Sequence, residues 1–330
     1  MVTAAELGER QIIKLLTNQF RKTSQMAIPF GDDVAGIFIN SKQIAILKTD
    51  TFVGSTDIPP TMTLRHAARK TVVMNVSDFA SKGVHPSALL VSLTIPRHYS
   101  KSDIEKIGNG LEAGAREYDT YIIGGDTGEG NDLIISLMVF GIASPDSLVL
   151  RKGAQIDDII AVTGMFGKTG AGLHILLHEF QTTESWKKPL IDSVLMPKAR
   201  LHEGKALVKE KLVTSSIDSS DGLAISLHEL KNNSGLGMAI SSIPIAEEVL
   251  AFSHKYGLNS EEFALFGGEE YELVLTIRPE NWIRAKELVN NLGGHLIPIG
   301  KVIEDPKVIS TSNHCVREIP ARGWEHFKTS

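Results

Sequence analysis

The chain has 330 residues, of which 42% are hydrophobic and 22% are charged, and its formal net charge is −5. This composition is typical of a globular protein with a substantial core, and the length is sufficient for two domains. The mildly acidic balance argues against a nucleic-acid-binding surface, which needs clustered positive charge. The single cysteine, Cys315, excludes an intrachain disulfide and a cysteine-based metal cluster.

The sequence also argues against a secreted or membrane-spanning protein. Glu6, Glu9 and Arg10 stand where a signal peptide would be apolar. The longest apolar run, residues 133–143, is too short to span a bilayer. A single cysteine fits a reducing compartment, so we expect a cytoplasmic protein with neither a membrane nor a nucleic-acid partner.

The first half of the chain predicts an alternation of helices and strands from its apolar spacing. We expect helices over 6–20, 63–83 and 102–118, and strands over 43–50, 88–96 and 133–143. Ser102 is the expected N-cap of the third helix, because Glu105 follows three residues later. Residues 121–132 predict a short strand followed by a glycine loop and a turn.

The second half begins after a polar connector, residues 144–158, in which we place the domain boundary. The predicted domains are 1–147 and 148–330. Strands are expected over 159–164, 236–245, 267–277 and 295–303, and helices over 169–180, 197–212, 245–257 and 280–294, with another helix from Leu223. Helices and strands mix in both halves, which predicts an α/β or α+β fold.

The segment "VTGMFGKTGAG" (162–172) has the composition of a phosphate-binding P-loop but not its spacing. That motif requires a glycine five residues before the Gly-Lys pair, and the chain has Val162 there. Two interpretations stay open. The segment is either a helix N-terminus that receives an anion or a plain strand-to-helix turn.

Aspartates recur where the expected elements begin or end. They are Asp32, Asp33, Asp50, Asp126, Asp218 and Asp221, with Asp78 inside an apolar helix. Most are explicable by turn or capping preferences, but a buried helical carboxylate such as Asp78 needs a partner. If these side chains converge they repel one another, and hard divalent cations with oxygen ligands relieve that repulsion. The residues alone therefore predict magnesium-dependent phosphate chemistry.

Eight segments, in order along nearly the whole chain, carry a family resemblance. They are "GDDVA" (31–35), "TDT" (49–51), "NVSDFASKGVHP" (75–86), "IGGDT" (123–127), "VTGMFGKTGAGL" (162–173), "IDSSDGL" (217–223), "GGEEYEL" (267–273) and "GWEHF" (323–327). Together they resemble the thiamine-monophosphate kinase family, which is related to aminoimidazole ribonucleotide synthetase, selenophosphate synthetase and the hydrogenase-maturation dehydratase. The last two segments favour the kinase within that superfamily.

The resemblance implies ATP-dependent phosphorylation of thiamine monophosphate to thiamine diphosphate by direct in-line transfer. It implies an N-terminal ATP- and magnesium-binding domain whose sheet pairs with its copy in a homodimer, and a C-terminal α/β domain. ATP and several magnesium ions would lie in the cleft between the domains.

The resemblance also implies a set of site residues. The implied metal ligands are Asp33, Thr49, Asp50, Asp78, Asp126, Asp218 and Asp221; the implied ATP contacts are Gly125, Asp126, Arg151 and Ser220; and the implied substrate contacts are Asp57, Glu269 and Trp324. No general base is implied, because the acceptor phosphate has a second pKa of about 6 and is mostly ionised at neutral pH. Metal held by Asp50 and Asp126 would assist the transfer instead.

Three residues depart from the family pattern. Lys48 stands where a hydroxyl residue is usual, and because lysine cannot ligate magnesium, one metal would be missing or replaced by the ammonium. Asp57 stands where many members have histidine, and Glu129 stands near a position where arginine is usual.

Two alternatives stay open. One is another ATP-dependent synthetase of the superfamily, similar to aminoimidazole ribonucleotide synthetase. The other is a non-catalytic nucleotide-binding relative, which Lys48 and Glu129 favour. Selenophosphate synthetase would need a reactive cysteine in an N-terminal glycine loop, and the hydrogenase-maturation protein a terminal one, whereas Cys315 is internal.

Overall fold

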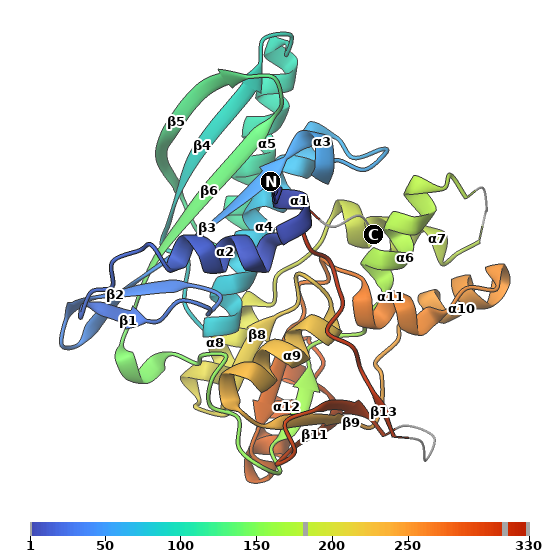
Figure 1. Cartoon of the computed structure of the whole chain (residues 1–330). Coiled ribbons are helices and arrows are strands. Elements are labelled where there is room, and N and C mark those ends of the chain that lie inside the picture. Colours follow the sequence, from blue (N-terminus) through green and yellow to red (C-terminus); the bar gives the residue numbers. More distant parts are fainter. Residues whose placement is uncertain (1, 181–183, 312–315, 328–330) are drawn as a thin grey trace.

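The computed structural model describes residues 2–180, 184–311 and 316–327, so Cys315 lies outside the described residues. Two mixed sheets are formed by successive parts of the chain, each with its own helices (Figure 1). This two-sheet arrangement confirms the predicted α/β class. The sheets are joined by a connector that includes the short helix Pro145–Ser147, and the boundary placed at 147/148 falls at its end.

The first sheet has six strands in the order β1-β2-β3-β6-β4-β5. Their bounds are β1 Met26–Ile28, β2 Ala35–Asn40, β3 Gln43–Val53, β4 Ala88–Pro96, β5 Ile122–Gly130 and β6 Ile134–Ala143. Strands β4 and β5 run parallel, and the other neighbours run antiparallel. The helices of this part are α1 Ala4–Leu7, α2 Glu9–Thr17, α3 Gly54–Asp57, α4 Leu64–Lys82 and α5 Lys101–Glu117.

The second sheet has seven strands in the order β13-β12-β9-β11-β7-β10-β8. Their bounds are β7 Ile159–Val162, β8 Ser215–Asp218, β9 Gly237–Ile240, β10 Leu273–Ile277, β11 Ile297–Ile303, β12 Val308–Ser310 and β13 Arg317–Glu318. The helices are α6 Lys168–Leu177, α7 Lys187–Leu195, α8 Leu201–Lys209, α9 Leu223–Ser234, α10 Glu247–Tyr256, α11 Ser260–Phe266, α12 Trp282–Asn291 and the short helix Pro279–Asn281.

Helix α4 joins the two parts of the molecule. It packs on β3 and β6 of the first sheet and also on β8 and α8 of the second part, so residues on all its sides are buried. A helix in that position needs apolar residues all round, and the polar exceptions stand out: Thr71, Asn75, Asp78 and Lys82 follow one another at spacings of three or four. Residues at that spacing share one helix face. The helix ends at Gly83, whose φ of 69° favours glycine.

The two faces of the first sheet differ. Thr51 of β3 pairs with Ser136 of β6, which pairs with Ser92 of β4, which pairs with Asp126 of β5. Directly paired residues point to the same face, and alternate residues such as Phe52 and Leu137 are buried on the face that α4 covers. We call the opposite face, which carries Thr51 and Asp126, the outer face of the first sheet.

Several element boundaries differ from the predictions. The first predicted helix is broken at Gly8, which has a φ of 73°, and the third is capped by Ser100 rather than Ser102, since the Ser100 side chain accepts from the Asp103 N–H. The glycine loop predicted after residue 123 was wrong, because β5 continues through it to Gly130 alongside β4. No helix in the described part of the chain is long and apolar enough to cross a membrane.

Candidate active site

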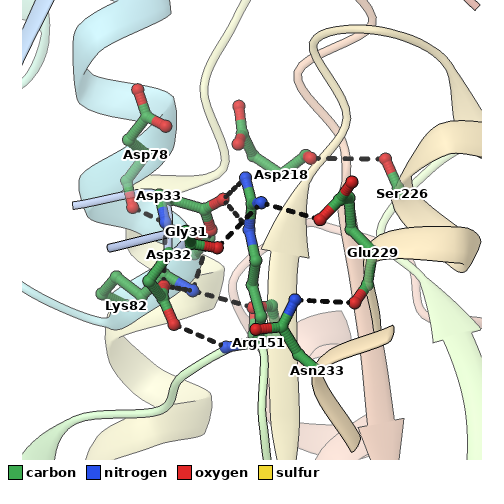
Figure 2. A network of polar contacts seen from close by, with 12 residues as sticks. Gly31, Asp32, Asp33, Asp78, Lys82, Arg151, Asp218, Ser226, Glu229 and Asn233 are labelled. Carbon is green, nitrogen blue, oxygen red and sulfur yellow. Dashed lines mark hydrogen bonds and ion pairs between the residues drawn. The ribbon is translucent and has the colours of Figure 1, made fainter. Parts of the chain in front are cut away.

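Three carboxylates from distant parts of the chain meet in one buried cluster. Asp33 lies in the loop between β1 and β2, Asp78 lies on α4, and Asp218 ends β8 (Figure 2). One oxygen of each lies within 4.8 Å of the others, and all three residues are buried. We call these three residues the carboxylate cluster. It joins the two halves of the molecule, because its members come from both.

The loop after Asp218 is held by the backbone of a second loop. The N–H of Ser219 donates to the Glu272 carbonyl at 2.8 Å, and the N–H of Tyr271 donates to the Ser219 carbonyl at 2.9 Å. The Glu269 N–H donates to the Ser220 carbonyl at 2.6 Å. The segments 218–222 and 267–272 therefore hold each other in place, and this fixes where Asp218 and Asp221 lie.

Two cations that belong to the chain surround Asp33. The Lys82 ammonium lies 2.8 Å from Asp33 Oδ2 and 2.7 Å from Asp32 Oδ1, and it also donates to the Ser216 carbonyl at 2.9 Å. The Arg151 guanidinium lies 2.5 Å from Asp33 Oδ1 and 3.3 Å from Glu229 Oε2. Figure 2 shows Arg151 between these two carboxylates. Lys82 and Glu229 were not predicted; the spacing of Lys82 four residues after Asp78 on one helix was the available signal.

Asp78 has a different cation, which enters from β3. The Lys48 ammonium lies 2.9 Å from Asp78 Oδ2. Lys48 pairs with Val139 across the sheet, and Val139 is fully buried on the α4 face. Asp50 lies two residues further on the same strand face, and its charge acts on Asp78 and on Asp221. The charge of Asp50 therefore acts on the site, and its role as a metal ligand stays a prediction.

The protonation equilibria show how much negative charge the site concentrates. Although burial disfavours the ionised form, Lys82 and Arg151 hold the pKa of Asp33 at about 2. Burial raises the pKa of Asp78 well above its usual range, with Lys48 opposing the shift. Burial and then the Asp33 charge raise the pKa of Asp218 to about 7, and burial and Glu9 raise that of Asp221 to about 6. Additional positive charge beside these carboxylates would therefore favour their ionisation.

The donor atoms fit a hard divalent cation. All three cluster residues offer carboxylate oxygens, which are the ligands that magnesium prefers. Asn75 lies three residues before Asp78 on the same face of α4, and its buried Oδ1 has no hydrogen-bond partner among the described residues. A buried unpartnered oxygen is costly unless something binds it. Asp33, Asp78 and Asp218, with Asp50 and Asp221 nearby, are the residues that would hold such an ion.

The loop "GGEEYEL" is strained and closely tied down. Glu269 and Tyr271 have φ values of 64° and 53°, which non-glycine residues rarely adopt. The Glu269 carboxylate lies 2.5 Å from the ammonium of Lys70, a residue of α4 that is only 2% exposed. Glu272 accepts from Arg200 at 2.6 and 2.8 Å and from the Thr163 hydroxyl at 2.7 Å. This strain is typical of functional sites.

The helix N-terminus at α6 binds an anion from the chain itself. Glu270 accepts from the N–H groups of Gly167 at 2.7 Å and Thr169 at 3.1 Å. Burial raises the pKa of Glu270 to about 7, although these hydrogen bonds lower it. Of the two interpretations of this segment, the anion-receiving helix start describes the structure, and the anion is a glutamate carboxylate.

Other predicted residues lie away from the carboxylate cluster within one chain. Thr49 alternates with Lys48 and Asp50 and therefore lies on the outer face, as does Asp126; Gly125 precedes it on edge strand β5. Asp57 accepts from the Val53 N–H at 2.8 Å and so stabilises its own turn. Ser220 is exposed in the loop after Asp218.

The tail near residue 324 reaches the site through its backbone. The Trp324 N–H donates to the Asp221 carbonyl at 3.0 Å, and its ring-bearing side chain begins beside Gly268. Trp324 is 48% exposed, so its ring is available to a ligand. The N–H of His326 donates to Glu9, which brings α2 to the same side.

Comparison with known proteins agrees with this architecture. Residues 31–143 match the N-terminal domain of AIR synthase related protein, and residues 155–313 match the C-terminal domain of the same family. The two sheets and the carboxylate cluster between them thus define a two-domain protein of the AIR synthase related class.

Relatives and solved structures narrow this class. Thiamine-monophosphate kinase from Nitrosopumilus maritimus is 35% identical over 98% of this chain and 100% of the relative, and that from Pyrococcus horikoshii is 32% identical over 98% and 97%. A solved structure described as AaThiL complexed with AMPPCP and TMP has a TM-score of 0.86 at 29% identity and covers 99% of both chains. The chain belongs to the thiamine-monophosphate kinase family.

Proposed function

We propose that this chain transfers the γ-phosphoryl group of ATP to the phosphate of thiamine monophosphate, which gives ADP and thiamine diphosphate. Relatives that are 30–35% identical over nearly the full length of the chain are thiamine-monophosphate kinases, and a structural neighbour is described as a complex with AMPPCP and TMP. The observation that carries the proposal is the carboxylate cluster, which gathers acidic residues from both domains of a chain in this family.

The chemistry suits the residues. An acceptor phosphate oxygen attacks the γ-phosphorus as the bond to the β-phosphate oxygen breaks, and ADP leaves. Because that oxygen is already mostly ionised, no side chain has to remove a proton. Magnesium at the cluster would neutralise phosphate charge and align the two reactants. Asp33, Asp50, Asp78, Asp218 and Asp221 would hold the metal.

The side chains of the loops would bind the organic parts of the substrates. Thiamine monophosphate carries a cationic thiazolium ring, which suits stacking on exposed Trp324 and the nearby carboxylate of Glu269. Gly125, Asp126, Arg151 and Ser220 remain the proposed ATP contacts. For Arg151, the pairing with Asp33 already places the guanidinium at the cluster, where it can donate to phosphate oxygens.

We also propose a homodimer that covers the outer face of the first sheet. This face carries Leu90 and Ile142, which are 37% and 46% exposed and which a second copy of the sheet would cover. Thr49 and Asp126 lie on the same face, so pairing would bury both predicted ligands. Light scattering should show a dimer for the parent chain and a monomer for Ile142→Lys. The control variant Ile283→Lys, on α12, should remain a dimer. A parent chain that is monomeric would contradict the proposed dimer. With ATP as donor, we place the enzyme in the cytoplasm.

The test of the function is product formation by the purified chain. Thiamine diphosphate should form only when ATP, thiamine monophosphate and magnesium are all present, and ADP release should depend on thiamine monophosphate. Asp218→Asn should lower the rate at least about 100-fold, because a lost metal ligand removes several kcal/mol of charge stabilisation. Asp146→Asn, in the exposed connector, is the matched control. Folded protein that makes no thiamine diphosphate would overturn the proposal.

A further inference from the structure

Lys48 introduces a positive charge into a site that is otherwise acidic. Its ammonium lies 2.9 Å from Asp78 Oδ2, and 23% of the side chain is exposed. Asp78, Asp50 and Asp218 are the charges that act on it most. Strand β3 directs the side chain onto the α4 face by its register with Val139, so the ammonium is aimed at the cluster by the backbone.

The ion pairs divide the carboxylate cluster into separate environments. Asp33 has Lys82 and Arg151, at 2.5–2.8 Å. Asp78 has Lys48, and Asp218 forms no ion pair among the described residues. The chain thus supplies its own cations to two carboxylates and leaves the third open.

A lysine ammonium and a divalent ion compete for the same carboxylate oxygen. The ammonium carries three donors and no lone pair, so it binds a carboxylate or a phosphate oxygen but never a metal. It also repels a metal ion placed beside it. A carboxylate oxygen already bound to an ammonium is therefore a poor metal ligand.

We propose that the Lys48 ammonium is a permanent cation of this site and takes the place of one divalent ion at Asp78. Asp218, with Asp221, then holds the metal that accompanies ATP, and Lys48 stabilises phosphate charge where a metal would otherwise do so. This inference rests on the proposed function, because it concerns how the same site neutralises its substrates.

The test counts metal ions directly. Mn²⁺ bound per chain is measured by equilibrium dialysis and electron paramagnetic resonance with a saturating non-hydrolysable ATP analogue. Lys48→Ser, which removes the charge and supplies a hydroxyl oxygen, should bind one more Mn²⁺ than the parent chain. Lys48→Arg keeps the charge and should bind the parent number. Lys42→Ser, in the exposed turn before β3, is the control for loss of any lysine and should also match the parent.

Each outcome is decisive. An equal Mn²⁺ count in the parent and in folded Lys48→Ser overturns the inference, and Lys48→Gln, which removes the charge and supplies an amide oxygen, gives the same test if the serine variant does not fold. If the parent chain binds Mn²⁺ and makes thiamine diphosphate, but Lys48→Ser binds the same number of Mn²⁺ ions as the parent, only the Lys48 inference is overturned. If the parent chain binds no Mn²⁺ with the analogue and makes no product, the proposed function is overturned.

Discussion

Asp33 and Asp218 belong to one cluster, yet their surroundings differ in charge. Asp33 is held between Lys82 and Arg151, whereas Asp218 has no ion pair among the described residues. A buried carboxylate is tolerated when a cation compensates it and is unfavourable when none does. The two carboxylates therefore have different roles. Asp33 is neutralised by cations of the chain and serves as a scaffold, whereas Asp218 has no compensating cation until one binds with the substrates.

Removing the cation of the compensated side should have the largest effect. Lys82 is fully buried and its ammonium contacts Asp32, Asp33 and the Ser216 carbonyl. Lys82→Met leaves two buried carboxylates without this partner, which should lower the free energy of unfolding by about 3–5 kcal/mol. Urea denaturation measures this change in the free energy of unfolding. Lys188→Met, at an exposed ion pair on α7, should change it by less than about 1 kcal/mol; similar losses for both variants would contradict the scaffold role.

Neutralising Asp33 and neutralising Asp218 should change the free energy of unfolding in opposite directions. In metal-free buffer with a chelator, Asp33→Asn strands the charges of Lys82 and Arg151 and should destabilise the chain by about 2–4 kcal/mol. Asp218→Asn removes a buried, unpaired carboxylate and should stabilise the metal-free chain by about 1–2 kcal/mol. Thermal and urea unfolding of both variants provide the measurement. Loss of stability in both would show that Asp218 is compensated after all.

Glu270 offers a comparison outside the metal site, where the pH dependence of folding can be measured. Its pKa in the folded chain is raised to about 7 from 4.5, mainly by burial, so the folded state binds this proton more tightly than the unfolded state. Stability should therefore fall as the pH rises from about 5 to 7, by at most about 1.4 kcal/mol per pH unit from this group. Glu270→Gln should flatten that slope, and Glu304→Gln, at an exposed residue, should not. An unchanged slope in the Glu270 variant would contradict the assignment.

The smallest expected effect concerns the loop beside the open side of the site. The buried Lys70 ammonium holds Glu269 in a strained backbone conformation. Lys70→Met should raise KM for thiamine monophosphate about tenfold, equivalent to about 1.4 kcal/mol, with a smaller change in KM for ATP. Steady-state kinetics with each substrate varied separately distinguishes the two. Equal increases in both would indicate a general loss of structure rather than of substrate orientation.

The convergence of three aspartates could be predicted from the sequence. Aspartates at element ends and one aspartate within an apolar helix indicated convergence, and Asp33, Asp78 and Asp218 do converge. Apolar spacing also predicted most helices and strands, since that signal is local. The start of α5 was predicted wrongly: Ser100 caps this helix, not Ser102, and both serines satisfy the local preference for serine at an N-cap.

The charge balance could not be predicted in the same way. Lys82 and Arg151, which pair with Asp33, lie 49 and 118 positions after it in the chain. The register of the sheet decides that Lys48 and Asp50 lie on the α4 face. The same register places Thr49 and Asp126 on the outer face. Likewise, the anion at the start of α6 is Glu270, which lies about a hundred residues further along the chain. These features depend on tertiary contacts.

The most direct test is to locate the metal. Crystals of the chain grown with Mn²⁺ and a non-hydrolysable ATP analogue would reveal bound manganese by its anomalous scattering. We predict that manganese is bound by the carboxylate of Asp218 at the position where the nucleotide phosphates bind. Manganese bound only to the nucleotide, with Asp218 unligated, would contradict the account.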